Sequence, residues 1–307
     1  MKRNYISQLK QILAVGAMTQ AGLAARLGVT FAALNRWMQG HARPRERHRL
    51  KIDALFRQVV GYPSVDEREI ASLIRQTKAL RREKLWEAIG QNQALQDDLL
   101  LEHTYNSTSI EGTTFTKRQT EGIIFNKGTV PDRTLIEHLE VTSHSAVLRE
   151  IFQDRLLGEI TEPLIRKLHA DLMRGIRDDA GNYSTHHRAI RGADIALTHP
   201  LDIPEEMKDL VREWKSAAAP KTIRDIADFH VHFELIHPFG DGNGRVGRLL
   251  MVIQCLQNRY PPVIIENARK IEYYDVLEYA QKKSSGPFVG FLADEMQKTS
   301  ARIARYI

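Results

Sequence analysis

Residues 237–248 read HPFGDGNGRVGR, and the apolar run LLMVI of residues 249–253 follows them. This pattern predicts a glycine-rich loop that leads into the N-terminus of a helix. At such an end, unpaired backbone N–H groups and the helix dipole attract an anion, and glycine lets the backbone approach it closely. The stretch therefore predicts a phosphate-binding turn within a helical fold.

Four side chains in this loop carry charged or titratable groups. Arg245 and Arg248 fall on neighbouring positions of the first helical turn, where two guanidinium groups suit further phosphate oxygens. Asp241 would repel a phosphate unless a cation intervenes, and Mg²⁺ is commonly held by one carboxylate plus phosphate oxygens. His237 belongs to the residue type that titrates near neutrality and suits a base taking a proton from a hydroxyl. The pattern indicates a polyphosphate site with a metal ion and a base.

Other known motifs match this part of the sequence less well. Residues 242–247 match the dinucleotide pattern GxGxxG, but residues 222–236 before them have helical spacing where that fold needs a strand. No Lys-Ser/Thr pair follows the glycines, as a Walker loop requires. His230, His232 and His237 lack an acidic or cysteine ligand at zinc spacing. The spacing favours the phosphate site over these motifs.

The chain around the loop follows helical periodicity from residue 66 onward. The segments predicted as helices are 66–100, 117–128, 131–155, 161–177, 204–217, 222–236, 244–258 and 270–284. Residues 182–199 are rich in polar residues and β-formers and predict a hairpin or flap, and residues 261–266 predict a short strand or an extended loop. The predicted fold class is therefore mainly all-α, with a short β-hairpin flap.

A basic segment precedes this helical part. Residues 1–62 carry eleven Lys and Arg against two Asp and Glu, a net charge of +9, while the rest of the chain carries −3. Within this segment Thr19 and Thr30 are placed as N-caps of two short helices, 20–27 and 31–39. Two short helices joined by a tight glycine turn predict a helix-turn-helix.

The spacing of TQAGLAARLGVTFAALNRWMQG, residues 19–40, resembles the Cro/repressor type of helix-turn-helix domain, over roughly residues 4–60. The resemblance implies that the second helix enters the major groove and turns Thr30, Phe31, Asn35 and Arg36 towards base edges. An excess of positive charge commonly serves phosphate neutralisation. We therefore expect DNA as a partner. We also expect a homodimer, because domains of this type usually bind DNA as dimers. The alternative is a small packing or dimerisation module with solvated charges.

The loop itself resembles the Fic signature HPFx[D/E]GNGRxxR and matches it at every defining position. The resemblance spans roughly residues 70–285 and includes the segment Gly-Asn-Tyr at 181–183. It implies a helical fold and transfer of AMP from ATP to a Ser, Thr or Tyr hydroxyl of a protein, with Mg²⁺ as cofactor. Family members often carry Arg where this chain has Ser184, so no substrate contact is inferred there.

The resemblance also implies roles for individual residues. His237 would deprotonate the target hydroxyl, and Asp241 would hold Mg²⁺. The expected ATP-binding residues are Phe239, Gly240, Gly242, Asn243, Gly244, Arg245, Arg248, Tyr273 and Tyr274. The two tyrosines would line the adenine pocket, although the sequence alone allows them equally to be core aromatics. Residues 187–199 would form a flap that pairs with an extended target segment by strand addition.

A second motif, STSIEG at residues 107–112, resembles the [S/T]xxxE[G/N] inhibitory helix of regulated Fic proteins. It implies that Ser107 and Glu111 are inhibitory, with Glu111 pairing with Arg248 in place of a γ-phosphate. ATP could then bind without seating its α-phosphate for attack. Taken alone, the motif could be a helix cap. Two alternatives stay open: a transcriptional regulator with a nucleotide-sensing site, and a de-AMPylase or a transferase of another nucleotide.

The composition, with 42% hydrophobic and 27% charged residues, is that of an ordinary globular protein. Pro63 and Ser64 break the helical pattern, so we expect a domain boundary there. The expected domains are 1–62, a helix-turn-helix domain; 63–116, a linker and inhibitory helical region; and 117–307, a Fic catalytic core with C-terminal helices. No stretch reaches the roughly 18 apolar residues of a membrane helix, so we expect no membrane partner and a cytoplasmic location.

Overall fold

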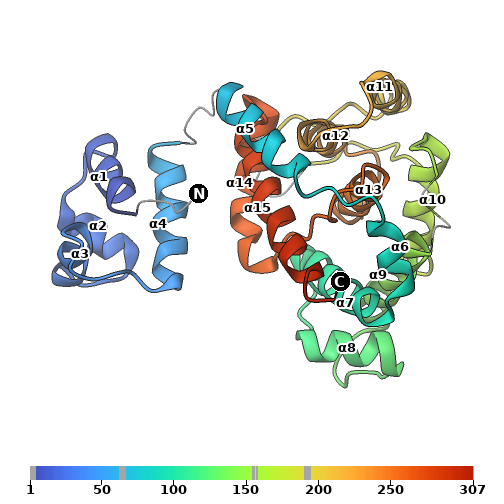
Figure 1. The fold of residues 1–307 in the computed structure, drawn as a ribbon, viewed down its shortest axis with the longest axis horizontal. Coiled ribbons are helices and arrows are strands. Elements are labelled where there is room, and N and C mark those ends of the chain that lie inside the picture. Colours follow the sequence, from blue (N-terminus) through green and yellow to red (C-terminus); the bar gives the residue numbers. More distant parts are fainter. Residues whose placement is uncertain (1–4, 62–66, 154–155, 157, 190–194, 307) are drawn as a thin grey trace. The chain divides into compact units, whose positions relative to one another are not determined.

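The structure, a computed structural model (Figure 1), describes residues 5–61, 67–153, 156, 158–189 and 195–306. Its contacts divide the chain into two compact units, Met1–Ser64 and Val65–Ile307. The predicted boundary segment falls mostly on residues 62–66, which lie outside the described residues.

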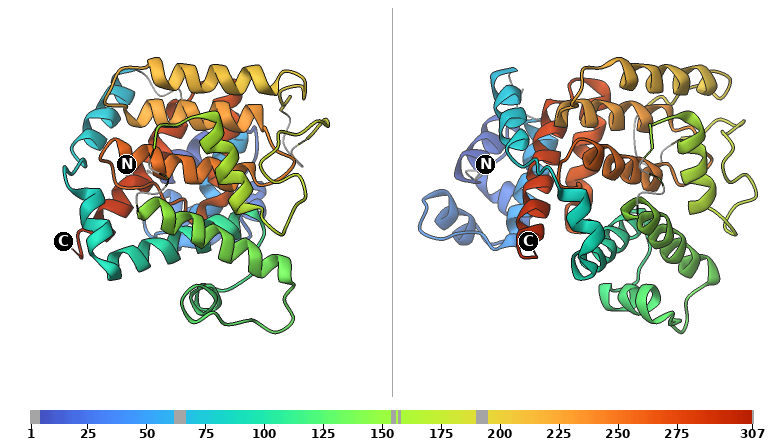
Figure 2. Two further views of the ribbon diagram at one scale, coloured as in Figure 1. Left: turned by 90° about the vertical axis from the view of Figure 1, so that its right-hand side faces the viewer. Right: turned by 45° about the vertical axis from the view of Figure 1, so that its right-hand side comes forward.

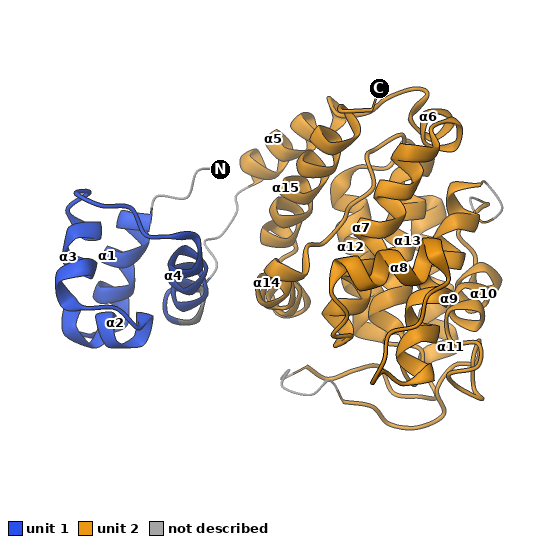
Figure 3. Cartoon of the chain, turned by 90° about the horizontal axis from the view of Figure 1, so that it is seen from below, with its two compact units in different colours: residues 1–64 blue, residues 65–307 orange. Residues whose placement is uncertain are grey.

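The first unit is helical throughout its described residues (Figure 3). It consists of α1 (Tyr5–Val15), α2 (Gln20–Leu27), α3 (Phe31–Met38) and α4 (Glu46–Val59). The hydroxyl of Thr19 accepts a bond from Gly22 N at 3.1 Å, and that of Thr30 accepts one from Ala33 N at 3.2 Å. Both predicted N-caps are thus confirmed, and Gly28 ends α2 in the left-handed conformation with φ of 68°.

We expect Thr19→Ala and Thr30→Ala each to lower the free energy of unfolding of this unit by about 1 kcal/mol, because each leaves an amide at a helix start without its acceptor. Urea unfolding of the full chain with Trp86 and Trp214 replaced by Phe, so that the fluorescence comes from Trp37 in the core of this unit, measures the change. Arg26→Ala, an exposed change on α2, is the control and should stay within about 0.5 kcal/mol of wild type. Equal effects from all three changes would contradict the capping argument.

The second unit is also helical, and its described residues contain no strand (Figure 2). Its helices are α5 (Glu67–Lys78), α6 (Leu85–Gln91), α7 (Gln93–Glu111), α8 (Lys117–Asn126), α9 (Leu135–Phe152), α10 (Glu162–Leu172), α11 (Ile203–Ser216), α12 (Ile223–Ile236), α13 (Asn243–Gln257), α14 (Lys270–Lys282) and α15 (Gly286–Ile303). The predicted helix 66–100 is divided among α5, α6 and the first part of α7. Asn92 separates the last two, because it caps Leu95 N at 3.0 Å. Among the described residues, no helix combines the length and apolar character needed to span a bilayer.

Helix α13 is the central element of this unit (Figures 1 and 2). It contacts α7, α9, α10 and α12 and is buried along almost its whole length, from Asn243 to Leu256. Its second half is mostly apolar, and a helix buried on all sides belongs in a core. The glycine-rich loop at its start is therefore held by the most enclosed helix of the unit.

The predicted β-hairpin is not found in the described part of residues 182–199, where the backbone has no strand; residues 190–194 lie outside the described residues. Here Ser184 N donates to the Pro238 carbonyl at 2.8 Å and Thr198 N to the Leu235 carbonyl at 3.3 Å. These backbone groups bond to the end of α12 and the loop after it, not across a hairpin. Residues 261–266 form the extended loop that was one of the two predicted options.

Candidate active site

The loop between α12 and α13 is closed by the side chain of Asn243. Its Oδ1 accepts from Phe239 N at 2.9 Å, and its Nδ2 donates to the Phe239 carbonyl at 2.9 Å. His237 and Gly242 bound the loop in left-handed conformations, with φ of 50° and 81°, a region that non-glycine residues rarely adopt. Because the Asn243 amide is used within the loop, anion binding at this turn falls to its backbone groups.

His169 of α10 contacts the loop through a hydrogen bond and a ring stack, a role that the sequence did not indicate. Its Nδ1 accepts from Gly181 N at 2.8 Å, so its Nε2 carries the proton and donates to the Asp241 carbonyl at 3.0 Å. Its ring stacks on Phe239 with centroids 3.8 Å apart. Burial lowers the pKa of His169 to about 4, so the ring stays neutral. Phe239, predicted to bind ATP, is fully buried in this stack.

His237 lies at the start of the loop with its side chain 21% exposed. Its Nδ1 is 3.7 Å from Oε2 of the buried Glu234, three residues earlier on α12. Burial, together with the charge of Arg188, lowers the pKa of His237 to about 4. The imidazole is therefore neutral at neutral pH and able to accept a proton.

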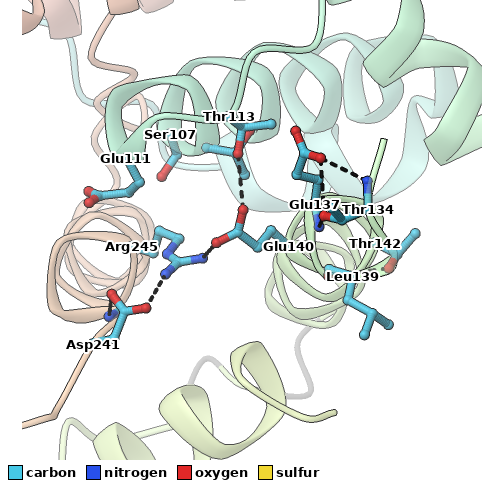
Figure 4. A network of polar contacts seen from close by, with 12 residues as sticks. Ser107, Glu111, Thr113, Thr134, Glu137, Leu139, Glu140, Thr142, Asp241 and Arg245 are labelled. Carbon is cyan, nitrogen blue, oxygen red and sulfur yellow. Dashed lines mark hydrogen bonds and ion pairs between the residues drawn. The ribbon is translucent and has the colours of Figure 1, made fainter. Parts of the chain in front are cut away.

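Arg245, with its side chain 2% exposed, lies between two carboxylates (Figure 4). Its Nη1 donates to Glu140 Oε1 of α9 at 2.7 Å, and its Nη2 lies 3.4 Å from Asp241 Oδ2. The Asp241 carboxylate is 53% exposed and also accepts from Gly242 N at 2.6 Å. The loop's aspartate thus faces solvent at the start of α13, and Glu140 is a further site residue.

Arg248, also 2% exposed, is bound by the end of α7. Its Nε donates to Ser107 Oγ at 2.9 Å, and its Nη2 donates to the Ser107 carbonyl at 3.0 Å and to Glu111 Oε1 at 2.6 Å. Burial opposes the charged form of this guanidinium, but Glu111 raises its pKa. The structure therefore brings together the two motifs that the sequence singled out separately.

The Glu111 carboxylate lies directly on the first turn of α13. A Cβ built on Gly244 would collide with Glu111 Oε1 and lie 3.0 Å from Arg248 Nη1. A helix N-terminus is where a phosphate group binds most favourably. Glu111 therefore occupies space beside the amides that an anionic ligand would use.

Neutral groups enclose the other side of Arg248. Burial lowers the pKa values of His103 and His230 to about 3 and raises that of Glu234 to about 8. His230 Nε2 is 2.8 Å from the hydroxyl of Tyr273, which is 1% exposed and packs among core aromatics, whereas Tyr274 is 39% exposed. Of the two tyrosines predicted to contact adenine, only Tyr274 is thus open to solvent.

Of the four residues predicted to contact DNA, Thr30 caps α3 and the other three lie on this helix. Phe31 is 53% exposed, an unusual exposure for an aromatic side chain, and Arg36 is exposed. Asn35 is partly buried and its Oδ1 accepts from Gln39 Nε2 at 3.3 Å. The Thr30 hydroxyl is engaged as the helix cap.

Comparison with known proteins supports a family for the second unit. Residues 159–255 match the model of the Fic/DOC family. The protein named protein adenylyltransferase Fic is 30% identical in Drosophila melanogaster, over 77% of this chain and 48% of that protein, and 31% identical in Drosophila willistoni, over 77% and 47%. The chain spans about half the length of these curated relatives. It therefore carries a Fic domain.

Solved structures share the fold. A Fic domain containing signaling protein from Bacteroides thetaiotaomicron has a TM-score of 0.63 and 25% identity, over 76% of this chain and 95% of that one. Fic-1 from C. elegans has a TM-score of 0.65 and 23% identity, over 93% and 84%. The predicted all-α class is confirmed by these neighbours and by the helices above.

Proposed function

We propose that this chain is a protein adenylyltransferase that moves AMP from ATP to a Ser, Thr or Tyr hydroxyl of a protein. The observation that carries the proposal is the start of α13, where two almost fully buried arginines, Arg245 and Arg248, follow a loop that begins with the neutral imidazole of His237. Their present partners are carboxylates, Glu140 and Glu111, so both guanidinium groups lie where anions bind, and a helix N-terminus favours phosphate. The names of the Drosophila relatives point to the same chemistry.

In the proposed reaction, the oxygen of the target hydroxyl forms a bond to the α-phosphorus of ATP, and the bond from that phosphorus to the bridging oxygen of pyrophosphate breaks. His237 accepts the hydroxyl proton, and pyrophosphate leaves. The turn at residues 240–244 and Arg245 hold phosphate oxygens, and Arg248 holds the outer phosphate. Catalysis then consists mainly of positioning and charge stabilisation.

The Asp241 carboxylate fits a role as the protein ligand of Mg²⁺. It is half-exposed at the phosphate end of the loop, and no group of three or more His, Cys, Asp and Glu within the described residues could hold a metal alone. One carboxylate plus phosphate oxygens is the usual arrangement for Mg²⁺ with a nucleotide. When bound, the ion neutralises phosphate charge. The target hydroxyl and His237 need no contact with it.

We further propose that Glu111 inhibits this activity. Its carboxylate binds the guanidinium that would bind the outer phosphate, with Ser107 holding the same group from the other side. ATP must therefore displace Glu111 or bind with its phosphates out of place. This arrangement lowers the rate without requiring that ATP binding be lost.

Mass spectrometry after incubation with Mg²⁺ and ATP tests the proposal in wild type, Glu111→Gly and Glu111→Gly/His237→Ala. AMP on the protein itself or on lysate proteins, gained by the first variant and lost by the second, supports both the transferase and its inhibition. ATP binding without AMP transfer in any form would favour a nucleotide sensor. Loss of AMP from a previously modified protein would favour the de-AMPylase.

We also propose that the first unit binds DNA. We expect the full chain to bind duplex DNA with strong salt dependence, and Arg36→Ala to reduce the slope of log affinity against log salt by about 1, if Arg36 contacts a phosphate. Fluorescence anisotropy between about 50 and 200 mM salt measures the slope. Arg75→Ala on α5 is the control outside the unit. Absence of salt-dependent binding would favour the packing module.

A further inference from the structure

Glu140 of α9 uses its two carboxylate oxygens in two directions (Figure 4). Oε1 accepts from Arg245 Nη1 at 2.7 Å, and Oε2 accepts from the hydroxyl of Thr113 at 3.2 Å. Thr113 is the second residue after the end of α7, beyond Gly112, which has φ of 116°. One side chain therefore contacts both the loop helix α13 and the segment that follows Glu111.

On the loop side, Glu140 shares Arg245 with Asp241. Its distance to the guanidinium is 2.7 Å, against 3.4 Å for Asp241. Because Arg245 is 2% exposed and Glu140 21%, solvent screens this pair weakly, whereas it screens Asp241, at 53%, more strongly. The guanidinium charge is divided between the two carboxylates. Without the charge of Glu140, Arg245 would attract Asp241 alone, and a cation would compete with Arg245 for that carboxylate.

Through its other oxygen, Glu140 holds the turn that follows α7. The backbone there closes through Gly112 N to the Ser109 carbonyl at 3.2 Å and Thr113 N to the Thr108 carbonyl at 3.1 Å. The Thr113 hydroxyl bonds this turn to α9, beside a second bond from Arg133 Nη1, just before α9, to the hydroxyl of Thr114. Helix ends fray unless they are tied to the structure around them. The bond to Glu140 therefore holds the turn that keeps Glu111 on Arg248.

We propose that Glu140 is a positioning residue that keeps Asp241 available for a divalent cation through Arg245 and holds the inhibitory end of α7 through Thr113. The proposal rests on the proposed function, because it assigns these two residues to cation binding and inhibition. It links the two halves of the site through a residue that itself touches neither substrate nor metal.

Three variants separate the two roles. Glu140→Gln removes the charge but keeps a side chain able to hydrogen-bond to both neighbours. Thr113→Val removes only the tie to α7. Glu140→Ala removes both, and Glu137→Gln, which removes a carboxylate charge from the same helix while leaving a side chain that suits the capping box, is the matched control.

Neither readout requires AMP transfer. Mn²⁺ binding in the presence of ATP, followed by electron paramagnetic resonance in the Glu111→Gly background, should weaken about 10-fold to 100-fold in both Glu140 variants and stay unchanged in Thr113→Val. Hydrogen exchange of residues 107–113 in the otherwise wild-type chain should speed up about 2-fold to 10-fold in Thr113→Val and Glu140→Ala, and stay unchanged in Glu140→Gln.

Equal behaviour of Glu140→Gln and Glu137→Gln in the Mn²⁺ measurement would overturn the cation role. Unchanged exchange in Thr113→Val would overturn the helix role. If Glu140→Ala does not fold, Glu140→Gln and Thr113→Val still decide the two roles separately. Failure of the adenylyltransferase proposal would instead show as absent AMP transfer in Glu111→Gly with these binding and exchange results intact.

Discussion

AMP transfer by the Glu111→Gly variant is expected to exceed that of the wild type by about 10-fold to 150-fold at saturating Mg²⁺ and ATP. The change removes the carboxylate that lies 2.6 Å from Arg248 and beside the first turn of α13. The freed guanidinium can then bind the outer phosphate and seat the α-phosphate. Initial rates of AMP incorporation, measured by mass spectrometry on the same acceptor, give the ratio.

Glu121→Gly is the matched control for this prediction. Glu121 is exposed on α8. The Glu121→Gly variant also replaces a helical glutamate by glycine, but away from the site, so its rate of AMP transfer should equal that of wild type. Glu111→Gln, which keeps the size but not the charge, should fall on the activated side. Rates of Glu111→Gly no higher than those of Glu121→Gly would rule out inhibition by this carboxylate.

Replacing His237 by Ala in the Glu111→Gly background is expected to lower the rate by about 10²-fold to 10⁴-fold, the usual contribution of a general base. The loop is closed by Asn243 and supported by His169, so it should keep its form without the imidazole. ATP affinity, measured by calorimetry, should stay close to that of the parent variant. An equal loss of ATP affinity would indicate a collapsed loop and not a missing base.

The pH dependence of the same reaction follows from the environment of His237. Burial lowers its pKa to about 4, and the neutral form is the one that accepts a proton. Lowering the pH through the ordinary histidine range near 6.5 therefore leaves the base active, and the rate should fall only as the pH approaches about 4. Rates measured from neutral to mildly acid pH check this, and an inflection near 6.5 would contradict the buried position.

Most of the helices could be predicted from patterns of neighbouring residues. The caps at Thr19 and Thr30 and the start of α13 depend on a few neighbouring residues, and the structure has them where the sequence predicts. The hairpin predicted for residues 182–199 is not found in the described part of that segment, where Ser184 N and Thr198 N bond to the loop after α12 and to α12 itself. A high β-propensity shows only that the side chains suit a pleated sheet. A strand forms there only if a second strand is available to pair with it.

The site was predictable where its residues belong to a motif of their own, as the loop and the pair Ser107 and Glu111 do, and not where single residues come from other helices. Glu140 and His169 belong to ordinary amphipathic helices, and nothing in their spacing marks them as neighbours of the loop. Arg245 was expected to bind phosphate, whereas in the structure its nearest partner is Glu140. Tyr273 and Tyr274 are adjacent in sequence, yet the packing of α14 buries one and exposes the other.

The pairing of Glu111 with Arg248 is intramolecular, and this sets its dependence on protein concentration. A tethered group competes at a fixed effective concentration, often in the millimolar range for flexible links and higher for a rigid one. Dilution, synthesis or degradation of the protein would leave the paired fraction unchanged, unlike an interaction with a separate regulatory chain. Under the proposed function, the fraction of Arg248 paired with Glu111 would therefore depend on the nucleotide concentration and on the conformation of α7, and not on the number of protein molecules present.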